Sequence, residues 1–412
     1  MVETSFPPTN QAWQSRLADL NPQVYAKTRN HLQGAVSRIS PYLTHGFLGL
    51  QEAVAGVRSH SRLEAMDKLF AELAWRSFFH HVWEWAGDGI FKDMRPGLPG
   101  IRYRSELPAD IREGRTGLAV IDQAVAALYE TGYLHNHARM WLASYVVHLR
   151  HVNWRAGADW MFGHLLDGDL ASNHLSWQWV AGTFSVKPYL FNADNVAKFA
   201  PAVWQCPGTP LDTSYEVLER MARGLDEDGR GKFESLSRYA RQRSDALAEP
   251  LLHQVPPPEL QQGALCSVSD LQAWLASSAW ASDLSRVELV HAWALRSAVS
   301  STVTTGTKPL RLGLIHLPAH RDWPWSHGRW QFVISRMREV CDAVFMGDVT
   351  SLQPALSCTQ SLLCLDSPGS PLTREAIAGL RPSWEEPIPW LTTPSRPCQS
   401  FSSYIRAVRE LR

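Results

Sequence analysis

Carboxylate, amide and indole side chains crowd into the thirteen residues from 167 to 179. Asp167, Asp169, Asn173, Trp177 and Trp179 all fall in this stretch, within an apolar context. Buried carboxylates and amides are costly unless a partner forms hydrogen bonds with them. A large, flat cofactor with polar edges would satisfy these groups and lie against the indoles. The stretch therefore indicates a cofactor-binding enzyme.

A second group of polar residues lies before an expected helix near the N-terminus. Residues 36–41 read Val-Ser-Arg-Ile-Ser-Pro, and Tyr25 and Arg29 precede them. Hydroxyls, a guanidinium and backbone amides at the start of a helix are suited to binding phosphate. Taken alone, the segment fits equally well a helix N-cap followed by a solvated arginine.

Two further patterns place polar side chains on one face of a helix. Glu72, Trp75 and Arg76 are three and four residues apart, so they share a helix face. The alternative interpretation is a surface Glu–Arg pair over a core aromatic. Arg139 and Met140 lie on one face of another expected helix together with Asn136, although a single methionine is normally a packing residue.

The histidines and cysteines do not indicate a metal site. His80-His81 and the pair His135 and His137 have neither an HExxH motif nor a carboxylate at ligand spacing, so solvated or core histidines are the favoured interpretation. The six cysteines include no CxxC pair, which favours reduced, packed thiols. We expect no bound metal.

The bulk composition fits a cytoplasmic protein of two domains. The chain has 412 residues, which is too many for one ordinary core. No apolar run reaches the roughly 18 residues that a membrane span needs, and the polar N-terminus does not look like a signal peptide. A net charge of zero argues against a polycationic surface but leaves open a local basic groove that binds a phosphate backbone.

The elements that position these residues change in character along the chain. Residues 1–205 are expected to be mostly helical, with helical spacing of apolar residues at 66–85, 119–130 and 136–151. Residues 206–263 are expected to form a linker with helices at 213–223 and 232–247 and a stiff proline run at 255–258. Residues 264–412 indicate a small α/β domain with strands at 310–317, 343–346 and 362–365, a helix at 330–340, and a mainly parallel sheet.

Taken together, these segments resemble the FAD-binding signature of the DNA photolyase/cryptochrome family over residues 21–205. The resemblance implies a mostly α fold, in which an all-helical FAD-binding domain precedes the smaller α/β domain. The family's α/β antenna domain, which normally precedes the helical domain, has no counterpart ahead of residue 21. We therefore expect FAD as the cofactor and no antenna chromophore.

The resemblance also implies a role for each residue that matches a family motif. It pairs Asp167 with Arg139 and sets Asn173 against the flavin. The residues implied to bind FAD are Tyr25, Val36, Ser37, Arg38, Ile39, Ser40, Arg76, Asn136, Arg139, Asp167, Asp169 and Asn173. Those implied to bind the damaged bases are Glu72, Trp75, Asn136, Met140 and Trp179, and those implied to act in catalysis are Glu72, Asn173, Trp154 and Trp177. Asn136 and Met140 favour enzymes for cyclobutane dimers over those for (6-4) photoproducts.

An electron path to the flavin is implied by two of the tryptophans. Trp177 and Trp154 match the first two members of the family's tryptophan chain, whereas Ile101 replaces the third, and Tyr103 is the nearest oxidisable substitute. Without the resemblance, two buried indoles would be interpreted as core.

Other departures from the family pattern affect the DNA-binding face. His137 stands where an arginine is common, and Lys187 lies in a shortened loop that lacks the usual arginine. The rim for a flipped base therefore has fewer cations than usual.

The expected function is light-driven, FAD-dependent repair of cyclobutane pyrimidine dimers by a deoxyribodipyrimidine photolyase. Its partner would be DNA that contains such dimers, with single-stranded DNA left open, and we expect a monomer without a membrane contact. The alternative is a cryptochrome-like blue-light photoreceptor without repair activity. A third hypothesis is a flavin-binding scaffold whose C-terminal domain recruits a partner.

Overall fold

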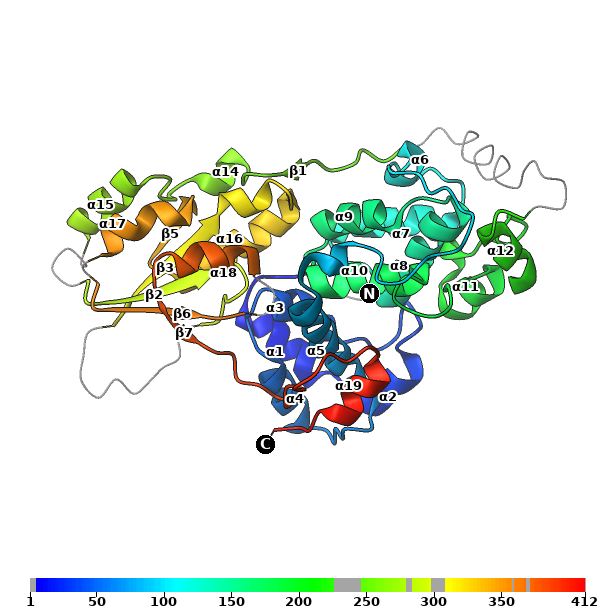
Figure 1. The fold of residues 1–412 in the computed structure, drawn as a ribbon, viewed down its shortest axis with the longest axis horizontal. Coiled ribbons are helices and arrows are strands. Elements are labelled where there is room, and N and C mark those ends of the chain that lie inside the picture. The colour runs from blue at the N-terminus through cyan, green and yellow to red at the C-terminus, as the bar shows by residue number, and fades with distance from the viewer. Residues whose placement is uncertain are drawn as a thin grey trace.

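The computed structural model describes residues 5–225, 246–278, 284–297, 308–357, 359–367 and 371–411. Figure 1 shows a parallel sheet with its helices at one end of the molecule and a group of helices at the other. The helix expected at 232–247 falls almost entirely outside the described residues.

Helices make up the first part of the chain, as predicted. They are α1 (Asn10–Ala18), α2 (Pro22–Thr28), α3 (Ser40–Thr44), α4 (Leu50–Arg58), α5 (Lys68–Ala86), η1 (Gly87–Phe91), α6 (Ala109–Arg112), α7 (Ala119–Thr131), α8 (Asn136–Ser144), η2 (Tyr145–Leu149), α9 (Trp154–His164), α10 (Leu170–Ala181), α11 (Ala193–Phe199), η3 (Ala202–Trp204) and α12 (Tyr215–Ala222).

The ends of these helices follow local chemistry. α5 stops at Gly87, whose φ of 53° is a conformation that glycine adopts without strain. α7 likewise stops at Gly132, which has φ 63°. The helix expected at 136–151 is divided, because the α-helix α8 passes into the π-helical turn η2.

A five-stranded parallel sheet forms the core of the second part. The remaining elements are β1 (Leu252–His253), α14 (Pro258–Gln261), α15 (Val268–Ser277), β2 (Arg286–His291), β3 (Leu310–His316), η4 (Leu317–His320), β4 (Trp325–Ser326), α16 (His327–Val340), β5 (Ala343–Gly347), η5 (Val349–Leu352), α17 (Gln353–Leu356), β6 (Ser361–Leu365), α18 (Pro371–Ala378), β7 (Ser383–Glu385) and α19 (Phe401–Ala407). The strand order is β5-β3-β2-β6-β7, and every pair in it is parallel. The expected parallel sheet is therefore present, with two strands, β2 and β7, that the pattern did not predict.

The two parts of the chain share one hydrophobic core. This core combines Leu69 and Phe70 of α5 with Trp330 and Phe332 of α16. The chain then returns to the helical part after β7, where α19 lies beside α5 (Figure 1). The division of the chain into domains at residues 205 and 263 stays a proposal. Residues 390–411 follow the sheet in the sequence but lie with the helical part.

Residues of the expected linker also pack on the helical part. Leu211, Leu218 and Met221 are buried in the second core cluster, which is formed mainly by α7 to α10. Among the described residues, no helix is both long enough and apolar enough to cross a membrane.

Candidate functional site

Two separate segments, α8 and α3, converge on Asp167. Arg139 of α8 donates from Nη2 to both carboxylate oxygens, at 2.9 and 2.8 Å. Ser40, the first residue of α3, donates to Oδ2 at 2.5 Å, and the Thr44 hydroxyl donates to the Asp167 backbone oxygen at 3.2 Å. The pairing that the resemblance implies is therefore present. It ties the start of α3 and the face of α8 to the turn before α10.

Asp169 caps α10 and lies against two side chains of α5, His80 and Arg76. Its carboxylate accepts from the Ser172 backbone N–H at 2.9 Å. Its Oδ1 lies 3.2 Å from His80 Nε2 and 3.7 Å from Arg76 Nη2. Burial by itself raises the pKa of Asp169, but the charges of His80 and Arg76 outweigh burial and lower that pKa well below its usual range. Asp169 is therefore a carboxylate at neutral pH.

The segment before α3 does not act as an ordinary helix cap. The N-cap is Ile39, which forms no side-chain capping hydrogen bond, and the Ser40 hydroxyl is bonded to Asp167 instead. Arg38 has φ 49°, which is unusual for a residue with a side chain and marks local strain. The N-cap alternative thus leaves both the Ser40 contact and the Arg38 conformation unexplained.

The face of α5 that carries Glu72 and Arg76 contacts both α2 and the start of α10. Glu72 Oε1 lies 2.8 Å from Arg29 Nη1 of α2, and Arg76 reaches Asp169. The alternative of a Glu72–Arg76 surface pair is therefore wrong. Burial raises the pKa of the Glu72 carboxyl, although the charges of Arg29 and Lys68 oppose that rise.

Trp75 is covered on one ring face by a residue from the far end of the chain. The ring of Phe401, at the start of α19, stacks on the Trp75 indole with centroids 4.1 Å apart and planes 8° apart. Trp75 remains half-buried, as do the other implied base-contacting residues Met140 and Trp179, while Asn136 is exposed. These residues are therefore accessible to a ligand.

The amide of Asn173 has a defined orientation. Its Nδ2 donates to the Ala158 carbonyl of α9 at 2.9 Å. Because a carbonyl can only accept, Nδ2 must point to α9, and Oδ1 points elsewhere as an acceptor. Trp177 lies one turn further along α10, so it shares the helix face of Asn173.

The two implied electron-path tryptophans are buried in the same core cluster. Trp154 is 4% and Trp177 is 2% exposed. The ring of Trp177 lies so close to Gly157 that a Cβ there would approach it to 2.3 Å. Gly157 is three residues from Trp154 on α9, so Trp177 packs on the helix face that carries Trp154.

The segment expected to provide the outer electron-path residue lies next to Trp154. Arg104 N donates to His151 O at 2.7 Å, and Asn153 N donates to Arg104 O at 2.8 Å. This pairing brings half-buried Tyr103 and Ile101 to the start of α9.

Sequence reasoning did not identify His80, Phe401 and Arg329. Arg329 of α16 is fully buried and donates to the carbonyls of Phe162, at 3.1 Å, and of Gly168, at 2.5 Å. Gly168 separates Asp167 from Asp169, so a side chain of the α/β part supports the turn. His80 is four residues from Arg76 and was detectable from helical spacing, whereas Arg329 and Phe401 had no local signal.

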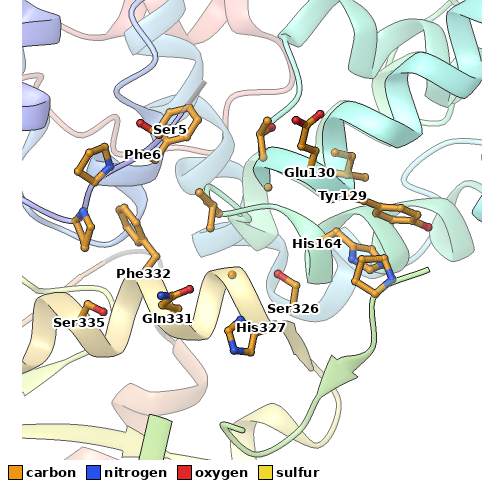
Figure 2. A pocket seen from close by; sticks show the side chains of 18 residues that line it. Ser5, Phe6, Tyr129, Glu130, His164, Ser326, His327, Gln331, Phe332 and Ser335 are labelled. Carbon is orange, nitrogen blue, oxygen red and sulfur yellow. The ribbon is translucent and has the colours of Figure 1, made fainter. Parts of the chain in front are cut away.

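A separate cavity of about 550 Å³ lies between the helical part and the N-terminal end of α16. Figure 2 shows Tyr129 and His164 on one side of it and Ser326, His327 and Phe332 on the other. None of the predicted site residues is among the described residues that line it, so this cavity is distinct from the candidate site. The ranges that the structure describes also contain no group of three His, Cys, Asp or Glu residues that could hold a metal ion.

The match to a known protein family lies in the helical part of the chain. Residues 69–203 match the family model described as the FAD-binding domain of DNA photolyase. A deoxyribodipyrimidine photo-lyase from Streptomyces griseus is 38% identical over 205 residues, which cover 47% of this chain and 45% of that protein. A cryptochrome DASH from Oryza sativa is 32% identical over 168 residues, covering 39% of this chain and 29% of that protein.

A solved structure of a Synechocystis cryptochrome aligns with a TM-score of 0.41 at 27% identity, covering 46% of this chain and 42% of that one. The chain thus covers less than half the length of each of these three proteins. The helical part of the chain is therefore similar to the FAD-binding domain of the DNA photolyase/cryptochrome family.

The residues present fit FAD as the cofactor. Within the described part of the chain, the buried Ser172 hydroxyl beside Asp169 has no hydrogen-bond partner. Such an orphaned polar atom requires an explanation, and the polar edge of a flavin would supply the missing partner.

Proposed function

We propose that this protein is a light-driven DNA repair lyase that splits cyclobutane pyrimidine dimers. The observation that supports the proposal best is the face of α5. There, Glu72 and Trp75 lie accessible within one turn of Arg76, whose guanidinium is directed to Asp169. Groups suited to a damaged base and a group suited to the cofactor are therefore held together by one rigid helix.

FAD, when bound and reduced, supplies the photochemical electron, and the protein supplies position and electrostatics. Asp167, Arg139, Ser40, Arg38 and Asp169 would hold the cofactor. Asp169 would accept from a donor on the flavin edge, and Arg38 would neutralise phosphate charge. Asn173 would present its Oδ1 acceptor to the flavin.

Glu72 and Trp75 would act on the flipped dimer. Burial raises the pKa of Glu72, so its carboxyl keeps a proton to higher pH than an ordinary carboxyl does. In that form it would donate a hydrogen bond to a carbonyl of the dimer as negative charge builds there. Half-buried Trp75 would stack on the dimer with the ring face that Phe401 does not cover. Met140, Trp179 and the Asn136 amide would complete the rim.

The test is dimer repair by the FAD-loaded, chemically reduced full chain under blue light. Single-stranded and double-stranded oligonucleotides that contain one cyclobutane dimer would both be assayed. We expect dimer loss only in the light. A Glu72→Ala variant should lose about 10- to 100-fold in rate, because a hydrogen bond to a charged group contributes about 1.5–3 kcal/mol.

Two controls accompany this experiment. Glu72→Gln keeps a hydrogen-bond donor and should repair faster than Glu72→Ala. Asn173→Ala tests the cofactor side, where we expect an altered flavin spectrum. Bound flavin that responds to light while every dimer stays intact would contradict the repair proposal.

One observation favours a cryptochrome-like photoreceptor as the second candidate. His137, at the position of a common family arginine, is 9% exposed and lies 2.8 Å from the Asn30 carbonyl. Burial lowers its pKa, so it is neutral near pH 7 and adds no cation for DNA. A salt-insensitive, weak interaction with DNA would support the photoreceptor, since phosphate contacts make binding fall steeply with salt.

A further inference from the structure

A carboxylate at the surface accepts a hydrogen bond from the indole N–H of the buried Trp154. Trp154 Nε1 donates to Asp93 Oδ1 at 2.6 Å. The Trp154 side chain is otherwise buried, at 4% exposure, whereas Asp93 is exposed on the segment that follows η1. The N–H of a core indole is thus connected to solvent through one carboxylate. A hydrogen bond to an ionised acceptor is also stronger than a neutral one.

Tyr103 lies in the same neighbourhood. Burial raises the pKa of the Tyr103 phenol, and the negative charge of Asp93 raises it further. The phenol is therefore protonated at neutral pH. Ile101, the residue that matches the outer tryptophan of the family chain, cannot be oxidised under mild conditions. This chain thus has a carboxylate in hydrogen-bond contact with Trp154 and no indole at position 101.

We propose that Asp93 is the proton acceptor that allows Trp154 to end the electron path in this protein. The inference rests on the proposed function, because it needs light-driven electron transfer to FAD. An indole radical cation is far more acidic than the neutral indole. A carboxylate in hydrogen-bond contact can therefore take the Nε1 proton as soon as Trp154 is oxidised. The neutral Trp154 radical has less drive to take the electron back.

Bound, oxidised FAD would, once excited by light, take one electron that Trp177 supplies and Trp154 replaces. The Nε1–H bond of Trp154 would then break, its proton would move to Asp93 Oδ1, and Asp93 would release that proton to solvent. A small thiol in solution would return one electron and one proton to Trp154, and two of the resulting thiyl radicals would couple to one disulfide.

Asp93→Asn separates this role from a structural one. Asparagine keeps an oxygen acceptor for the Trp154 N–H but is not a base. If Asp93 only orients the indole, Asp93→Asn should behave as the wild type. If Asp93 takes the proton, the variant should keep its fold and lose the deprotonation step.

The experiment is laser-flash absorption of the FAD-loaded full chain with oxidised flavin, in H₂O and in D₂O. In the wild type we expect a tryptophan radical cation that converts to the neutral radical, with slower conversion in D₂O. In Asp93→Asn we expect the cation to persist until the electron returns, and lasting photoreduction to fall about tenfold. Tyr103→Phe should leave the radical spectrum unchanged.

Several outcomes would overturn the inference. The first is an Asp93→Asn variant in which the radical cation converts to the neutral radical at the wild-type rate and with the wild-type isotope effect. The second is loss of the neutral radical in Tyr103→Phe, which would mean that the phenol takes part in the proton transfer. A wild type that forms no tryptophan radical would do so too. Repair by chemically pre-reduced wild-type protein, measured alongside, tests the proposed function separately, because it needs no photoreduction.

A measurement in the dark gives a second readout. The Trp154 indole ¹H–¹⁵N resonance of the full chain, assigned with Trp154→Phe, should shift with pH as Asp93 titrates. The shift should be absent in Asp93→Asn. A resonance that does not move with pH in the wild type would contradict the hydrogen bond itself.

Discussion

Arg329 provides the sharpest test of how the α/β part supports the turn at residues 167–169, which we propose binds the flavin. It is fully buried, donates to the carbonyls of Phe162 and Gly168, and lies over the ring of Trp325 at 4.2 Å. Burial lowers the pKa of Arg329 to about 9, so its guanidinium is still protonated at neutral pH. Replacing it with alanine leaves a cavity and two carbonyls without their donor.

The expected cost of Arg329→Ala is about 3–5 kcal/mol. Two charge-assisted hydrogen bonds contribute about 1.5–3 kcal/mol each, and truncation of a large core side chain adds a cavity term. Relief of the buried charge offsets part of that sum. Arg329→Met fills most of the space and removes the ion, so we expect a smaller loss of about 1–2 kcal/mol.

Urea unfolding of the full chain, followed by tryptophan fluorescence, would measure these differences. Arg321→Ala is the matched control, because Arg321 is exposed and should change stability by less than about 0.5 kcal/mol. FAD affinity should also fall about tenfold in Arg329→Ala, since Gly168 separates Asp167 from Asp169, the two aspartates that we propose hold the flavin. A stability within about 1 kcal/mol of the wild type would refute the reasoning.

Three further predictions concern the same region. Burial lowers the pKa of His45 to about 3, so its stabilising contribution is complete above the unfolded pKa of about 6.5 and is lost as the pH falls toward 3. The free energy of unfolding, measured with urea, should be about 2 kcal/mol lower at pH 5 for this reason. His45→Asn should flatten this pH dependence. Phe401→Ala removes a stack of about 0.5–1.5 kcal/mol on Trp75 and should weaken binding of dimer-containing DNA up to about tenfold, with Phe401→Tyr close to the wild type; equal affinities would contradict the stack's role. Asp167→Asn leaves Arg139 without its ion pair and should weaken FAD binding about 10- to 100-fold by fluorescence titration, whereas unchanged affinity would remove Asp167 from the cofactor site.

Helical spacing predicted the scaffold of the site well. α5 and α7 begin and end within about two residues of the expected ranges, because their apolar residues repeat at helical spacing and glycine ends each helix. The strands β3, β5 and β6 were predicted from short apolar runs. β2 is largely buried and β7 has only three residues, and both were missed because such short segments have no distinctive period. The placement of residues 390–411 against α5 was missed for a different reason, since packing partners that are distant in sequence leave no repeat.

The sequence by itself determined which side chains could bind a cofactor. Asp167, Asp169 and Asn173 occur at fixed spacing in one short stretch, and the geometry of one turn and one helix largely sets their relative positions. Only the tertiary structure decided their partners. Phe401 covers Trp75, Arg329 supports Gly168 and Asp93 accepts from Trp154, and each contact joins segments whose separation along the chain, from about sixty to more than three hundred residues, carries no periodic signal. Such contacts follow from close packing of the whole core, which no local pattern encodes.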